Sequence, residues 1–183
     1  NGQQGLFAMA TGTGKTITSL NCLQELYKRT GYYKAIILVP TITLVNQWES
    51  ECRKFNFNTI LKVSGSNSDW REELGSIKAS EQLDTTGKSV SYVIICTYAS
   101  FAKPAVFDKL NSLSRNRLLL IADEAHNMGS RQLMKKLGDI TYYRRIGLSA
   151  TPERQYDATG NNAINTFFNS KECFSSTNCM SDF

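Results

Sequence analysis

The sequence predicts an α/β domain in which a mostly parallel central sheet is flanked by helices. Five short apolar runs lack polar alternation, as expected of parallel strands covered on both faces: Leu6–Met9, Ala35–Val39, Tyr92–Cys96, Leu118–Ala122 and Ile146–Ala150. Helical patterns lie between these runs, so strand and helix alternate along the chain. This order implies right-handed crossovers and places a ligand at the carboxyl ends of the strands.

The helices are predicted from apolar residues at helical spacing. One apolar face contains Ile17, Leu20, Leu23 and Tyr27, and a second contains Leu44, Trp48, Cys52 and Phe55, with Glu49, Arg53 and Lys54 turned outward. A further strand is expected near Thr59 to Val63, and the polar stretch 64–91 is expected to be a loop with a short helix. We expect one domain over residues 1–169. The Ser-, Asn- and Cys-containing tail, residues 170–183, is expected to be poorly ordered.

Composition limits the class of protein. A chain of 183 residues with 41% hydrophobic content suits one globular domain, and its net charge of +5 would suit a polyanionic partner without establishing one. The five cysteines form no C-x-x-C pair and His126 is the sole histidine, which favours free thiols over a zinc site. With no membrane-length apolar run and no secretory signal, we expect a soluble cytoplasmic protein. Because the chain begins at Asn1, we expect a fragment.

A glycine-rich motif, Met9 to Thr16, follows the first expected strand and leads into the first expected helix. Gly12 and Gly14 allow the backbone around Thr13 to turn successive N–H groups toward a phosphate at the helix N-terminus. Lys15 would then reach the β and γ phosphates, and the Thr16 hydroxyl would bind Mg²⁺. Met9 stands where the general pattern has glycine, so a glycine-rich turn without function stays an alternative.

An acidic pair, Asp123 and Glu124, ends the apolar run 118–122 and is expected at the same sheet edge as the phosphate loop. One carboxylate can hold Mg²⁺, usually through water, and the next can deprotonate the water that attacks the γ-phosphate. We assign these roles to Asp123 and Glu124 respectively. An Asp-Glu pair after a strand can also be a solvated helix cap, but the loop at Lys15 favours catalysis.

These motifs resemble the DEAD/DEAH-like group of superfamily-two helicases. The loop is similar to motif I, Asp123 to His126 has the DEAH form of motif II, and Ser149-Ala150-Thr151 matches motif III. Further matches are Val39-Pro40-Thr41 with Leu44 to Trp48 as motif Ia, and Cys96-Thr97-Tyr98 as the next strand-loop element. The resemblance implies a RecA-like P-loop NTPase domain, the first ATP-binding motor domain of a helicase. Met9 and the phrase 148–154 are most similar to the restriction-enzyme and excision-repair branch, which implies DNA.

The resemblance also implies roles beyond the nucleotide. Pro40, Thr41, Thr97 and Tyr98 would lie along a nucleic-acid backbone, where N–H and hydroxyl donors can bind phosphates without reading bases. Ordinary strand-end turns are the alternative for each. Coupling of the ATP state to nucleic-acid binding would fall to His126, Ser149 and Thr151, for which hydroxyl caps and a structural histidine are the alternatives.

Three functions remain open from the sequence. The first is a DNA-dependent ATPase that translocates on or opens duplexes, the second an RNA helicase, and the third an ATP-gated nucleic-acid-binding module. A motor of this group also needs a second motor domain, whose arginines reach the γ-phosphate. Trp70 with Arg71, and the pair Phe167 and Phe168, could stack on bases but are more typical of packing.

Overall fold

A six-stranded parallel sheet forms the centre of the molecule in a computed structural model of the chain. The structure describes residues 3–10, 12–65, 67–113, 117–150 and 157–169. The strands have these bounds: β1 Gln3–Ala8, β2 Lys34–Val39, β3 Ile60–Val63, β4 Tyr92–Thr97, β5 Leu119–Asp123 and β6 Arg144–Ser149. Their spatial order is β1-β6-β5-β2-β4-β3, which confirms the α/β class and the parallel sheet.

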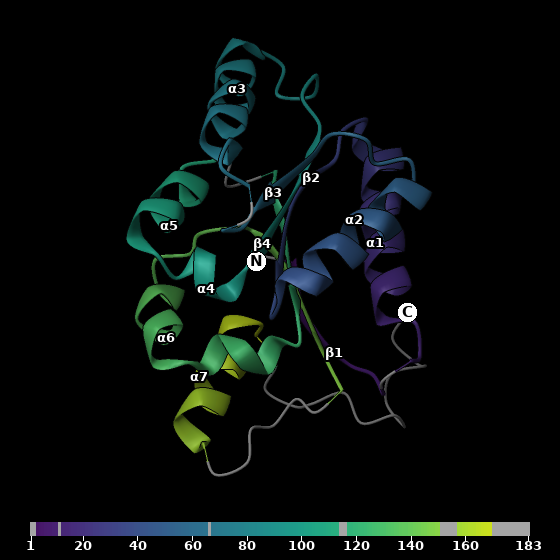
Figure 1. Cartoon of the computed structure of the whole chain (residues 1–183). Coiled ribbons are helices and arrows are strands. Elements are labelled where there is room, and N and C mark those ends of the chain that lie inside the picture. Colours follow the sequence, from purple (N-terminus) through teal and green to yellow (C-terminus); the bar gives the residue numbers. More distant parts are fainter. Residues whose placement is uncertain (1–2, 11, 66, 114–116, 151–156, 170–183) are drawn as a thin grey trace.

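Helices cover both faces of the sheet (Figure 1). Two lie on one face: α1 Lys15–Thr30 and α2 Ile42–Lys54. The other face carries α3 Trp70–Leu83, α4 Tyr98–Phe101, α5 Pro104–Asn111, α6 Arg131–Leu137 and α7 Ala158–Phe167, and a short 3-10 helix, η1, spans Ala125–Gly129. Each face has its own buried apolar cluster, so the sheet is fully enclosed, as its uninterrupted apolar strands require.

The expected helix faces are partly confirmed. Leu20 and Leu23 are fully buried on α1, whereas Ile17 and Tyr27 are exposed. In α2, the fully enclosed residues include Trp48 and Cys52, while Leu44 and Phe55 are half-buried against the same cluster. The helix ends follow local chemistry, because the Thr41 hydroxyl accepts from Leu44 N at the start of α2 and a left-handed Gly31 ends α1.

One expectation of the sequence analysis is wrong. Residues 64–91 contain a 14-residue helix, α3, and not merely a loop with a short helix. Its polar composition and internal Gly75 hide a narrow apolar stripe, in which Trp70 and Leu74 are buried and Ile77 packs against them. Burial of that stripe against the sheet stabilises the helix. The strand expected near Thr59 to Val63 is confirmed as β3.

None of the helices in the described ranges has the length and apolar content needed to span a membrane. The tail, residues 170–183, lies outside the described residues.

Candidate active site

The predicted site residues meet at the carboxyl edge of the sheet. β6 lies between β1 and β5, so the segment after β1 and the acidic pair at the end of β5 are separated by one strand. Met9 N donates to Ser149 O at 3.0 Å, which extends the β1–β6 pairing into the start of the phosphate loop. Strand order therefore brings three distant motifs to one place.

The phosphate loop has the backbone geometry that its glycines predict. Gly12 and Gly14 lie in the left-handed region, at φ +80° and +89°, where a side chain would be strained. The Thr13 hydroxyl donates to Ala10 O at 2.7 Å and tightens the turn. Gly14 caps α1 without a side-chain hydrogen bond, so the first N–H groups of the helix stay available to an anion. Thr11 lies outside the described residues.

Lys15 and Glu124 form the central contact of the site. Lys15 Nζ lies 3.3 Å from Glu124 Oε1, although the two residues are 109 positions apart. The exposed fractions of the two side chains are 10% and 30%, so the lysine is held inside and the carboxylate faces solvent. A half-buried Thr16 follows in the first turn of α1. The cation expected to bind phosphate and the carboxylate expected to activate water are thus neighbours.

The backbone at Glu124 is unusual. Its φ is +49°, a left-handed conformation that few residues other than glycine, asparagine or aspartate adopt, and one that costs free energy. Local hydrogen bonds hold it, since Glu124 N donates to Asp123 Oδ1 at 3.0 Å and Asn127 Nδ2 donates to Glu124 O at 2.9 Å. Such strain is typical of functional positions. The sequence analysis missed Asn127.

Asp123 is buried at the end of β5, with 7% of its surface exposed. Burial raises the pKa of its carboxyl, and the nearby charge of Glu124 adds to this, while a hydrogen bond from Trp48 opposes it. The Trp48 Nε1–Asp123 Oδ2 distance is 2.9 Å. The sequence analysis placed Trp48 on an apolar helix face and at the end of motif Ia, without a contact to Asp123. Its indole N–H, which needs an acceptor when buried, was the available signal.

His126 connects the acidic pair to the end of β6. Its Nδ1 lies 3.3 Å from Ser149 Oγ and 3.6 Å from Glu124 Oε2. Ser149 is fully buried, so this contact occupies a protected position between two motifs. Thr151, the third residue expected in coupling, lies outside the described residues.

The four residues expected along a nucleic acid gather where β2 and β4 end. Val39 and Thr97 are partners in the β2–β4 register, so Pro40 and Tyr98 follow neighbouring strands. Thr41 is exposed and Pro40 half-buried. In contrast, Thr97 and Tyr98 are buried: the Thr97 hydroxyl caps α4, and Tyr98 Oη donates to Asp123 O at 2.8 Å. Both of these side chains therefore point into the structure.

The aromatic residues considered for base stacking are packed in the core. Trp70 and Phe167 are each 5% exposed, and Phe168 is fully buried. The Arg71 guanidinium lies 4.7 Å from the centre of the Trp70 ring. All three aromatic rings are therefore packed in the protein interior, which is the alternative to base stacking.

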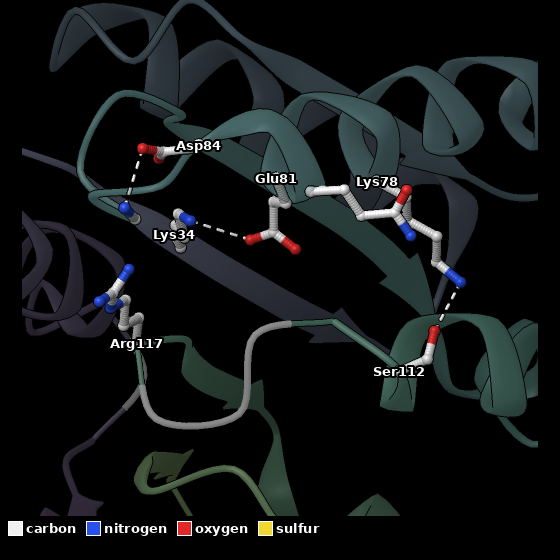
Figure 2. Close-up of a pocket in the computed structure, with 8 residues that line it drawn as sticks. Lys34, Lys78, Glu81, Asp84, Ser112 and Arg117 are labelled. Atoms are coloured by element: carbon white, nitrogen blue, oxygen red, sulfur yellow. Dashed lines mark hydrogen bonds and ion pairs between the residues drawn. The ribbon is translucent and has the colours of Figure 1, made fainter.

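A separate cavity of about 370 Å³ opens near the amino ends of the strands (Figure 2). Lys34, the first residue of β2, forms a 2.9 Å ion pair there with Glu81. The Asp84 carboxylate accepts N–H bonds from its own turn, at Gly87 and Ser89. Since these charges have partners and the cavity lies at the opposite edge, it is not part of the candidate site.

The side chains at the carboxyl edge fit a magnesium nucleotide. Asp123 and Thr16 offer hard oxygen ligands, and Mg²⁺ is usually held by one or two carboxylates together with phosphates and water. Within the described ranges, no group of three or more His, Cys, Asp or Glu side chains is arranged to hold a metal.

Comparison with known proteins shows the fold and the class of protein. The ATPase core of the SWI2/SNF2 protein of Sulfolobus solfataricus, solved with double-stranded DNA, aligns with a TM-score of 0.66 and 19% identity, covering 100% of this chain and 35% of that one. This alignment shows a RecA-like fold. The phosphate loop, the acidic pair and a family match over residues 1–154 make the chain a first ATPase domain of a superfamily-two helicase. Residues 1–154 match the family described as type III restriction enzyme, res subunit. The chain belongs to that family.

Curated relatives agree with this assignment. Putative helicase 22 of Sulfolobus islandicus filamentous virus (isolate Iceland/Hveragerdi) is 32% identical over 151 residues, which are 82% of this chain and 25% of the relative. The DNA 3'-5' translocase XPB2 of Sulfurisphaera tokodaii is 28% identical over 155 residues, 83% of this chain and 28% of the relative. The matched part of the chain thus spans about a quarter of the length of these relatives.

Proposed function

We propose that this chain is the ATP-binding motor domain of a DNA helicase or translocase, and that it hydrolyses ATP to ADP and phosphate to move on or open DNA. The contact between Lys15 and Glu124 carries this proposal. It joins a phosphate-binding lysine to a solvent-facing carboxylate, beside a buried Asp123. ATP hydrolysis needs these three groups together.

Each residue then has a defined task. The N–H groups around Gly12, Thr13 and Gly14 would bind the phosphates, and Lys15 would neutralise charge on the β and γ groups. Thr16 and Asp123 would hold Mg²⁺, Asp123 through water. Glu124, the more exposed carboxylate, would accept the proton of the attacking water. Phosphate binding would compete with Glu124 for Lys15 and free the carboxylate for that role.

A link from the nucleotide to the rest of the motor is supported by His126. It contacts both Glu124 and Ser149, so a change at the acidic pair can reach the end of β6 through one imidazole. We propose that His126, Ser149 and Thr151 couple the state of the nucleotide to DNA binding.

For the nucleic acid, we propose the edge formed by Pro40, Thr41, Thr97 and Tyr98. Thr41 is exposed and can offer its hydroxyl, whereas Thr97 and Tyr98 would contribute through the backbone, because their side chains are buried. Tyr98 would also tie this edge to the metal site through its bond to Asp123 O. We prefer DNA to RNA because the XPB2 relative is named a DNA translocase and the SWI2/SNF2 core was solved with DNA.

We propose that the motor works with a second motor domain in the same protein, because the relatives are about three times as long as this chain and arginines from a second domain complete such sites. The test measures phosphate release by a protein that carries both domains, with duplex DNA, single-stranded DNA, RNA or no nucleic acid. Stimulation by DNA, abolished by Glu124→Gln, supports the proposal. Stimulation by RNA alone would establish an RNA helicase. ATP-dependent DNA binding without hydrolysis would establish a gated binding module.

A further inference from the structure

Trp48 connects α2 to the proposed metal carboxylate. Its side chain is 1% exposed within the apolar cluster that α1 and α2 form on their face of the sheet. From there the indole N–H reaches Asp123 Oδ2 at 2.9 Å, across 75 positions of sequence. The buried apolar face of α2 therefore places one hydrogen-bond donor, the Trp48 indole N–H, at the end of β5.

The donor completes the support of the carboxylate. Asp123 Oδ1 accepts from the backbone N of Glu124 at 3.0 Å, and Oδ2 accepts from Trp48. Among the described residues, Trp48 is the side chain that donates a hydrogen bond to this carboxylate. With one donor on each oxygen, rotation of the group is restricted, while each oxygen keeps a second lone pair for a cation or its water.

Packing and hydrogen bonding by this side chain can be separated. Val45 and Cys52 fill the same face of α2, and a phenylalanine would supply aromatic bulk at position 48. What phenylalanine lacks is the N–H. A buried carboxylate that loses a donor is destabilised in its charged form, and its orientation is freed.

We propose that Trp48 is a positioning residue that holds the Asp123 carboxylate for Mg²⁺. The inference rests on the proposed function, in which Asp123 binds the ion of Mg-ATP. Residues that orient metal ligands in this way affect metal affinity by about 10- to 100-fold when removed. Nucleotide binding without metal depends on the phosphate loop and is expected to be independent of Trp48.

The test compares Trp48→Phe with Trp70→Phe in the 183-residue chain. Trp70 is also buried, and it lies in the cluster on the opposite face, so the same chemical change there is a matched control. Binding of a fluorescent N-methylanthraniloyl derivative of ATP is titrated in EDTA and at increasing Mg²⁺. We expect Trp48→Phe to raise the half-saturating Mg²⁺ concentration at least 10-fold. Affinity in EDTA should stay within about twofold, and Trp70→Phe should change neither quantity.

Two further variants make the readout specific. In an Asp123→Ala background, Trp48→Phe should have no further effect on Mg²⁺ dependence, because no side-chain oxygen is left at position 123 to accept the indole N–H. If Trp48→Phe does not fold, benzothienylalanine at position 48 replaces the N–H by sulfur with almost the same ring shape, and the same shift is expected.

The outcomes separate this inference from the proposed function. Three results would each overturn the positioning role: equal Mg²⁺ dependence in the two tryptophan variants, a loss of affinity in EDTA as large as that in Mg²⁺, or a full additional effect of Trp48→Phe in Asp123→Ala. If the unmodified chain itself showed no Mg²⁺-dependent nucleotide binding, the proposed function would fail, and the inference with it.

Discussion

Replacement of Lys15 by alanine should separate nucleotide binding from stability. Its Nζ lies 3.3 Å from Glu124 Oε1, where the Coulomb attraction at an effective dielectric constant of about 20 is roughly 5 kcal/mol. Desolvation of both ions opposes most of this, and Glu124 stays hydrated once unpaired because 30% of its side chain is exposed. We therefore expect Lys15→Ala to cost only about 1 kcal/mol of folding free energy, or roughly 2–4 °C in Tm.

The expected loss of nucleotide affinity is much larger. A hydrogen bond from lysine to a charged phosphate contributes about 1.5–3 kcal/mol, which corresponds to roughly 10- to 150-fold in Kd. The fluorescent ATP derivative reports the affinity with Mg²⁺ present, and a thermal melt of the same sample reports stability.

Lys28→Ala provides the matched control for this experiment. Lys28 is on the same helix and also forms an ion pair, with Glu25 at 2.6 Å, but both side chains are more than half exposed. Lys28→Ala should therefore change neither affinity nor Tm measurably. If Lys15→Ala bound the ATP derivative as tightly as Lys28→Ala does, the assignment of the phosphate loop would be refuted. A fall of more than about 10 °C in Tm would show that Lys15 is mainly structural.

Three further outcomes are expected. In a two-domain protein, Glu124→Gln should bind Mg-ATP normally but release phosphate very slowly, because an amide cannot accept the proton; equal losses of affinity and rate would indicate a metal ligand instead. Residues 1–183 alone should show little DNA-stimulated phosphate release, since arginines from a second domain are typically worth about 10³- to 10⁵-fold, and robust turnover would contradict this. At Asp84, partial burial opposes ionisation, but hydrogen bonds from Thr86 and three backbone N–H groups outweigh it and hold the carboxyl pKa well below its usual range. Because the folded-state pKa is depressed, this stabilisation is present above the ordinary pKa of about 4 and is lost as pH falls. The Tm deficit of Asp84→Asn should accordingly be largest near pH 7 and shrink toward pH 3, whereas a constant deficit would refute the linkage.

Local chemistry explains why the fold class and the position of the candidate site could be predicted. Uninterrupted apolar runs identify strands covered on both faces, and Gly12 and Gly14 identify a turn that needs positive φ. Lys15 and Glu124 were assigned from residue type and position after a strand, and their 3.3 Å contact agrees with a common site. Helix α3 is longer than the short helix expected there, because its apolar stripe is narrow and its extent depends on packing against the sheet.

The sequence by itself determined the parts of this protein: parallel strands, a phosphate loop and an acidic pair, each encoded within a few neighbouring residues. Tertiary structure decided what those parts contact. In the folded chain, β6 lies between β1 and β5. The hydroxyl of Tyr98 donates to Asp123 O, and the Trp48 indole donates to the Asp123 carboxylate. Both contacts are buried, and a buried polar group without a hydrogen-bond partner costs free energy. The partners are far apart in the sequence, so no local sequence pattern predicts these contacts.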